Sequence, residues 1–234
     1  MSNFLGNLLG SLLKFVYDTV SMIGNEPKYF SFYAMAIIIT TIIFKLILLP
    51  ISIHQSKASK KIAELQPKLQ EIQKKYKYDP QIMQAKTLEL YREAKYNPAS
   101  GCLILLIQIP IIFAFFKVMQ QPTVFAFKDL NLYQTMNKAF LWISNLENPD
   151  PYIWGLPLLA GITTYIQSMT LNAVQDDKTR ESMKIMNTVL PVFIFLAARS
   201  FPAGLALYWV VSNIFSIIQQ LISIRSLPKV KEEK

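Results

Sequence analysis

The chain has 234 residues, 52% of them hydrophobic, and a formal net charge of +9 at pH 7. Apolar runs of about 20 residues recur along it, which excludes an ordinary soluble domain and predicts an all-α, polytopic membrane protein. Cys102 is the only cysteine and His54 the only histidine, so an intramolecular disulfide is excluded and a histidine-based metal centre or triad is disfavoured. We therefore expect no catalytic residues, no metal site and no cofactor.

The N-terminal segment, residues 1–28, places apolar residues at helical spacing with polar residues between them. Phe4, Leu8, Leu12 and Phe15 belong to this apolar series. The pattern predicts an amphipathic helix that lies in the membrane interface on the extracytoplasmic side. An uncleaved signal anchor is the alternative interpretation.

The first expected transmembrane span, residues 29–54, contains one lysine, Lys45, in an otherwise apolar run. A cation in the hydrocarbon core costs about 2.5–3.5 kcal/mol on insertion scales, so it must be hydrated, paired with an acidic group or needed for function. None of the other expected spans contains an aspartate or glutamate that could pair with it. The simplest arrangement is a water-filled cavity within the membrane. A lysine that snorkels to the interface, or one that serves only packing, is the alternative.

Residues 55–98 are rich in lysine and carry a narrow apolar seam at spacings of three and four residues, formed by Ile62, Leu65, Leu69, Ile72 and Tyr76. The pair Asp79-Pro80 is typical of a helix start, with the aspartate as N-cap and the proline in the first turn. Together these features predict a cytoplasmic helical hairpin. A solvated basic linker is the alternative.

Further spans are expected at residues 99–120, 153–174, 184–199 and 203–225. An extracytoplasmic interfacial segment at 121–152, a cytoplasmic loop at 175–183 and an outer turn at 200–202 separate them, and the chain ends in a basic cytoplasmic tail at 226–234. Most basic residues fall in the hairpin, in the loop after the third span and in the tail. The positive-inside rule then places the N-terminus outside and the C-terminus in the cytoplasm.

Three stretches of sequence stand out in this order. The first is Thr-Ile-Ile-Phe-Lys-Leu-Ile-Leu-Leu-Pro-Ile around Lys45. The second is Gln66-Pro-Lys-Leu-Gln-Glu-Ile-Gln-Lys-Lys-Tyr, with Asn97-Pro-Ala-Ser-Gly-Cys-Leu and Gln108-Ile-Pro110, and the third is Phe201-Pro-Ala-Gly-Leu-Ala-Leu-Tyr-Trp-Val-Val-Ser-Asn213. Together they resemble the YidC/Oxa/Alb family of membrane protein insertases over residues 30–227. Family members usually carry arginine where Lys45 stands, and the short N-terminal segment resembles the Gram-positive form.

This resemblance implies five core helices that enclose a groove open to the cytoplasm and to lipid. Matched residue by residue, the family-like groove positions are Thr41, Lys45, Gln167 and Trp209, and the further polar candidates include Gln108 and Asn213. For Trp209, an ordinary core or interface aromatic is the alternative. For Gln167 and Asn213, the alternative is an interhelical hydrogen bond that only stabilises the bundle.

The implied function is that of a membrane protein insertase, not an enzyme, in the plasma membrane of a bacterium. It would move apolar segments and short polar tails of nascent proteins into the lipid bilayer, alone or with the Sec translocon. The ribosome and the signal recognition particle pathway are further candidate partners, whereas DNA is not expected. An auxiliary assembly factor without independent insertase activity is the alternative. A small-molecule transporter and an intramembrane hydrolase are disfavoured, because the sequence lacks internal repeats and a nucleophile–base pair.

Overall fold

The computed structural model describes residues 2–97, 103–172 and 177–225. Its regular elements in these ranges are all helices: α1 (Ser2–Ser21), α2 (Phe32–Ile47), α3 (Leu49–Lys75), α4 (Pro80–Glu93), α5 (Leu103–Gln120), α6 (Pro122–Phe125), α7 (Leu130–Thr135), α8 (Leu156–Asn172), α9 (Asp177–Ala198) and α10 (Ala203–Arg225). The expected all-α class is therefore confirmed for this part of the chain.

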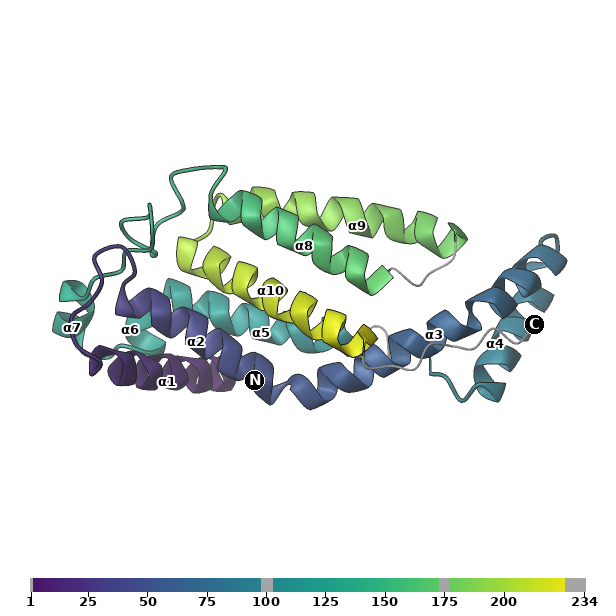
Figure 1. Ribbon diagram of the computed structural model, residues 1–234, viewed down its shortest axis with the longest axis horizontal. Helices are drawn as coiled ribbons and strands as arrows, with labels where there is room; N and C mark the ends of the chain where they lie inside the picture. The colour runs from purple at the N-terminus through teal and green to yellow at the C-terminus, as the bar shows by residue number, and fades with distance from the viewer. Residues whose placement is uncertain (1, 98–102, 173–176, 226–234) are drawn as a thin grey trace.

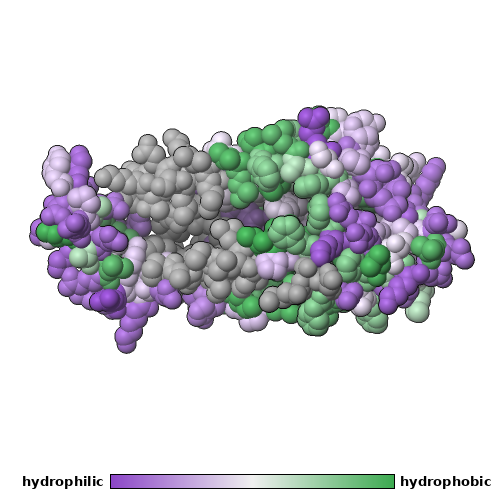
Figure 2. Space-filling view, turned by 180° about the vertical axis from the view of Figure 1, so that it is seen from behind, coloured by the Kyte–Doolittle hydropathy of each residue, from purple (hydrophilic) through white to green (hydrophobic). Residues whose placement is uncertain are grey.

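The helices α2, α5, α8, α9 and α10 lie side by side along the longest axis of the molecule (Figure 1). Within this bundle α10 packs against α2, α5 and α8, while α9 packs mainly against α8. The hairpin of α3 and α4 extends beyond one end of the bundle, and the short helices α6 and α7 lie towards the opposite end. Hydrophobic surface gathers over the middle of the molecule and hydrophilic surface at its two ends (Figure 2).

Helices that are long and apolar enough to cross a bilayer are fewer than expected. Within the described residues there is one, Ala203–Ile222, with a mean hydropathy of 1.6, beside the shorter apolar stretches Phe32–Ile47, Ile109–Gln120 and Asn187–Ala198. The first expected span is shortened because α2 ends at Ile47 and a new helix begins at Leu49, with Pro50 in its first turn. Proline has no N–H to continue the hydrogen bonding of the preceding helix. The division into five spans stays a prediction.

Two side-chain caps determine where α2 and α4 begin. Ser31 Oγ accepts a hydrogen bond from Ala34 N at 3.1 Å at the start of α2. Asp79 Oδ1 accepts one from Ile82 N at 3.1 Å at the start of α4, as the Asp79-Pro80 pair predicts. Because α3 packs against α4, this region forms a helical hairpin. Its cytoplasmic location stays a prediction.

The N-terminal helix α1 packs lengthwise beside α2 and α5 (Figure 1). It buries Leu9 and Leu13, whereas Phe4 and Phe15 are 70% and 67% exposed. A glycine is required at position 10, because a Cβ there would lie 2.1 Å from the carbonyl oxygen of Phe125. The amphipathic helix thus forms as expected, and its position in the membrane interface stays a prediction.

The segment between α5 and α8 caps the start of α8 through a buried carboxylate. Asp150 accepts hydrogen bonds from Trp142 Nε1 at 3.1 Å, from Tyr152 N at 2.9 Å and from Leu156 N at 2.7 Å. The Leu156 N–H has no partner within its own helix, since it lies in the first turn. Asp150 therefore ties the start of α8 to this segment.

The same segment also holds the start of α10. Ala203 N donates to the carbonyl oxygen of Asn148, and Gly204 N donates to that of Leu146, both at 2.8 Å. These N–H groups belong to the first turn of α10, where helix-internal acceptors are missing. One connecting segment thus fixes the ends of α8 and α10 relative to each other.

Between these contacts lies a polar cluster around Glu147. Tyr133 Oη donates to Glu147 Oε1, Lys138 Nζ lies 2.9 Å from Glu147 Oε2, and Asn145 Nδ2 donates to Oε2 at 3.2 Å. Lys138 Nζ also lies 3.6 Å from the centre of the Tyr133 ring. Burial, with Tyr33 and Glu147 nearby, raises the pKa of Tyr133, so its hydroxyl remains a donor.

Replacing Asp150 by alanine should destabilise the fold, because three hydrogen bonds to a buried carboxylate are lost. We expect a loss of about 2–4 kcal/mol, since a hydrogen bond to a charged group contributes about 1.5–3 kcal/mol and neighbouring ones do not add fully. The midpoint of thermal unfolding in detergent micelles measures this loss of stability. Glu89→Ala is the matched control, because it removes a carboxylate from an exposed pair with Lys86. Equal midpoints for the two variants would contradict the capping role.

Glu147 should make the fold sensitive to acid. Burial alone would raise its pKa, but hydrogen bonds from Tyr133, Lys138 and Asn145 hold that pKa below its ordinary value. A carboxyl group of this kind stabilises the fold above its unfolded pKa of about 4.3, and that stabilisation is lost as the pH falls through the folded pKa. The difference in thermal midpoint between wild type and Glu147→Gln should therefore shrink from about pH 6 towards pH 3. A constant difference over that range would exclude a contribution from the charge.

Candidate functional site

A stripe of polar side chains runs along one side of α10. Trp209, Asn213, Ser216 and Gln220 follow one another at spacings of four, three and four residues, so they share one face of the helix. The remainder of this helix is mostly apolar. A polar stripe inside a bundle needs hydrogen-bond partners on the neighbouring helices.

The first half of the stripe finds its partners on α8. Trp209 Nε1 donates to Thr164 Oγ1 at 2.9 Å. The Asn213 amide oxygen lies 3.1 Å from Thr163 Oγ1 and 2.9 Å from Thr164 Oγ1, and the amide nitrogen donates to Gln167 Oε1 at 2.6 Å. Three of the predicted groove residues, Gln167, Trp209 and Asn213, are thus brought together in one hydrogen-bonded cluster between α8 and α10.

The second half of the stripe faces α2 and α3. Lys45, in the last turn of α2, donates from Nζ to Ser216 Oγ at 3.0 Å. Beyond it, Gln219 Nε2 donates to Ser52 Oγ at 2.7 Å, and Ser56 Oγ lies 3.4 Å from Gln220 Oε1. A polar seam therefore continues from Lys45 along the first turns of α3.

Lys45 is half-buried, and its partner is a neutral hydroxyl. Among the residues that the structure describes, it forms no salt bridge. An ammonium group has three N–H donors, of which the hydrogen bond to Ser216 uses one.

Of the other two predicted groove residues, only Thr41 has a described side chain. Thr41 is buried, and its hydroxyl donates to the carbonyl oxygen of Ile37 at 2.7 Å within α2. Its backbone is one helical turn from Lys45, as expected, but its polar atom is already satisfied. Gln108 belongs to α5, and its side chain lies outside the described residues.

Sequence reasoning missed the polar partners of the seam. Ser52, Ser56, Ser216 and Gln219 were not among the expected site residues, although they supply hydrogen bonds between α10 and the α2–α3 region. The spacing Ser212, Ser216, Gln219 in an apolar helix could have indicated them.

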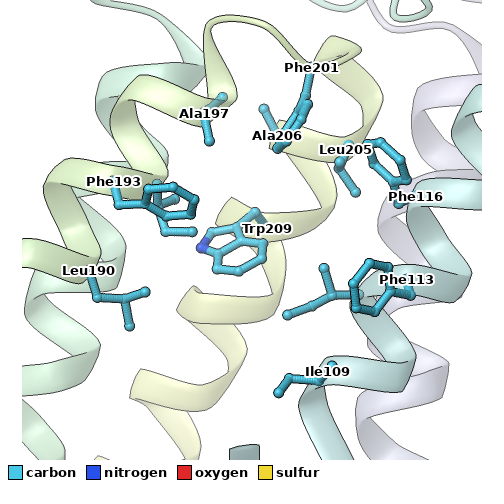
Figure 3. Close-up of a pocket in the computed structure, with 13 residues that line it drawn as sticks. Ile109, Phe113, Phe116, Leu190, Phe193, Ala197, Phe201, Leu205, Ala206 and Trp209 are labelled. Atoms are coloured by element: carbon cyan, nitrogen blue, oxygen red, sulfur yellow. The ribbon is translucent and has the colours of Figure 1, made fainter. Parts of the chain in front are cut away.

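An apolar groove of about 370 Å³ lies between α5, α9 and α10 (Figure 3). Phe113 and Phe116 line it from α5, Leu190 and Phe193 from α9, and Trp209 from α10. Because the Trp209 N–H is turned to Thr164, the indole offers its carbon ring to this groove. The two sides of α10 thus differ in character: one borders the apolar groove, and the other carries polar groups, one of which bonds to the Lys45 cation of α2.

The comparisons with known proteins agree with one another. Residues 26–231 match the family model described as the 60Kd inner membrane protein. The chain is 36% identical over 218 residues to the membrane protein insertase YidC of Fusobacterium nucleatum, covering 93% of this chain and 96% of that one. It is 37% identical over 225 residues to the YidC of Caldanaerobacter subterraneus, covering 96% of each chain.

A solved structure gives the same result. The active YidC insertase crystal structure with the first transmembrane domain resolved superimposes with a TM-score of 0.64 and 29% identity, covering 90% of this chain and 45% of that one. The fold is therefore that of a polytopic, all-helical membrane protein. More narrowly, the chain belongs to the YidC family of membrane protein insertases, the 60Kd inner membrane protein family. This confirms the family predicted from the three sequence stretches, and its function is insertion, not catalysis of a chemical reaction.

Asn213 is expected to contribute to stability through the α8–α10 cluster. Replacement by alanine would remove the contacts of the Asn213 amide with Thr163, Thr164 and Gln167 and leave Trp209 as the hydrogen-bond partner of Thr164 on α10. Interhelical hydrogen bonds in membrane bundles contribute about 0.6–1.7 kcal/mol, so a loss of that size is expected in unfolding by denaturing detergent. The exposed Asn131→Ala, in α7, is the control and should change little. Equal stability of the Asn213→Ala variant and wild type would contradict a structural contribution of the cluster.

Proposed function

We propose that this insertase moves short polar tails through a hydrated, positively charged groove floored by α10 and flanked by α8 on one side and by α2 and α3 on the other. The observation that carries the proposal is Lys45, half-buried beside α10 with a hydroxyl partner and no salt bridge among the described residues. A cation in this position is free to attract an acidic group, and groove water with the nearby hydroxyl and amide groups would replace bulk solvent around the tail.

We place the protein in the plasma membrane of a bacterium, with its N-terminus outside. In this arrangement α2, α5, α8, α9 and α10 are the five spans, α1 lies at the outer interface, and the α3–α4 hairpin is cytoplasmic. The excess of basic residues in 55–98 supports this orientation through the positive-inside rule. The hydrophilic surface at both ends of the molecule and the hydrophobic middle are consistent with it (Figure 2).

The substrate's apolar segment would follow a separate route. We place this route along the apolar groove between α5, α9 and α10. Transfer of apolar surface from water contributes about 25 cal/mol per Å², which supplies the driving force. Trp209 borders both routes, with its N–H on the polar side and its ring on the apolar side.

Nascent membrane proteins are the partners that insertase function implies. We further propose that the protein works alone or beside the Sec translocon, and receives substrates from the ribosome or the signal recognition particle pathway. The basic surface of the hairpin, with exposed Lys68, Lys74, Lys75 and Lys77, supports a contact with an anionic partner.

Insertion into liposomes tests the groove. A single-span substrate with an acidic outer tail is presented to reconstituted wild type, Lys45→Arg and Lys45→Gln, with protease protection of the tail as the readout. We expect Lys45→Arg to keep most activity and Lys45→Gln to lose about tenfold, because a charge–charge attraction in a partly hydrated site contributes about 1–4 kcal/mol. The circular dichroism spectrum and elution profile of each variant control for folding.

Two other outcomes would change the proposal. Equal insertion by Lys45→Arg and Lys45→Gln would assign Lys45 a structural role. If wild type did not exceed empty liposomes, the auxiliary assembly-factor function would be favoured instead.

A further inference from the structure

We propose that Ser216 is a positioning residue for Lys45: it holds the ammonium group on the surface of α10, where an incoming carboxylate can reach it. The inference rests on the proposed function of Lys45 and adds a residue to that site. Its basis is the 3.0 Å hydrogen bond from Lys45 Nζ to Ser216 Oγ, which joins two helices across 171 positions of sequence.

The Ser216 hydroxyl is oriented to act as an acceptor. Its own proton is donated to the carbonyl oxygen of Ser212, at 2.9 Å, one turn earlier in α10. A hydroxyl has one proton and two lone pairs, so this bond leaves only acceptor positions towards Lys45. The orientation of the serine is thus fixed before the lysine arrives, and it suits a cation.

Without such an acceptor, the Lys45 side chain could adopt another position. It stands two residues before the end of α2 at Ile47, and the carbonyl oxygens in the last turn of a helix are acceptors that a nearby lysine can reach. Those carbonyls and the negative end of the helix dipole attract a lysine, and its flexible stem can follow them. Ser216 therefore selects one position among several that the side chain could adopt.

A neutral partner also preserves the charge for the substrate. The hydroxyl satisfies one N–H of the ammonium group, and two donors are left among the described contacts. An acid at position 216 would instead form an ion pair with Lys45 and compete with a substrate carboxylate. A serine holds the cation without neutralising it.

A purely structural role for Ser216 predicts a different effect of its substitution. The α10 interface with α3 already contains the Ser52–Gln219 pair at 2.7 Å, which does not involve Lys45. If Ser216 only held helices together, its loss would resemble the loss of Ser52. Ser52→Ala is therefore the matched control: the same substitution, at the neighbouring α3–α10 contact, where the hydroxyl bonds to Gln219 and not to Lys45.

The test compares two substrates that differ only in the tail, one with aspartates and one with asparagines at the same positions. Insertion of both into liposomes is measured for wild type, Ser216→Ala, Ser216→Thr, Ser52→Ala and Lys45→Gln. We expect Ser216→Ala to reduce the preference for the acidic tail by about threefold, the size of one exchanged hydrogen bond. Ser216→Thr, which keeps the hydroxyl, should retain the preference, and Ser52→Ala should leave it unchanged.

A transposed pair provides a second measurement. Lys45→Ser combined with Ser216→Lys keeps a cation and a hydroxyl at this contact but exchanges the helices, α2 and α10, that carry them. If a charge at this contact determines the preference for the acidic tail, the double variant should recover the preference that Lys45→Ser alone loses.

The outcomes separate this inference from the proposed function. If wild type and Lys45→Gln show the same tail preference, the groove proposal itself fails. If those two differ while Ser216→Ala equals wild type, or Ser216→Ala lowers insertion of both substrates equally, only the positioning role is overturned.

Discussion

The polar stripe on α10 is the constraint on which the arrangement of the neighbouring helices depends. A buried amide without a partner costs about 1–3 kcal/mol, so Asn213, the buried amide of the stripe, must be matched from outside the helix. Asn213 is matched by α8, Ser216 bonds to α2, and Gln219, beside the stripe, bonds to α3. A shift of either neighbour along α10 by one turn would separate these pairs. Hydrogen-bond matching therefore sets the register of two separate helix contacts.

The helix α9 is held in another way. It packs closely on α8, where a Cβ on Gly161 would lie 3.0 Å from the Cβ of Phe195, and has little contact with α10. The α8–α9 pair thus joins α10 mainly through the face of α8 that carries the threonines. The apolar groove between α9 and α5 is consequently not filled by close helix packing. The α8–α9 pair therefore contributes a polar wall, from α8, and an apolar wall, from α9.

The sequence was informative wherever one residue or a local pattern decides the outcome. The helical class, the Asp79 cap and the family are confirmed. Hydrogen bonds between residues far apart in the sequence could not be predicted. Ser216 and Gln219 find their partners only through the alignment of α2 and α3 along α10. The hydroxyl of Thr41 shows the same limit: helical spacing gives its face, but its bond to Ile37 depends on a rotamer.

The break between α2 and α3 links the charged site to the hairpin. Pro50 lies in the first turn of α3, so the chain leaves α2 soon after Lys45 and starts a new helix. The first turns of α3 place Ser52 and Ser56 opposite Gln219 and Gln220 on α10, where α2 itself no longer extends. Polar contacts therefore continue without interruption from Lys45 towards the α3–α4 hairpin. If one straight helix ran through residue 50, α3 would follow the direction of α2. The polar connection between Lys45 and the hairpin therefore depends on the break between the two helices.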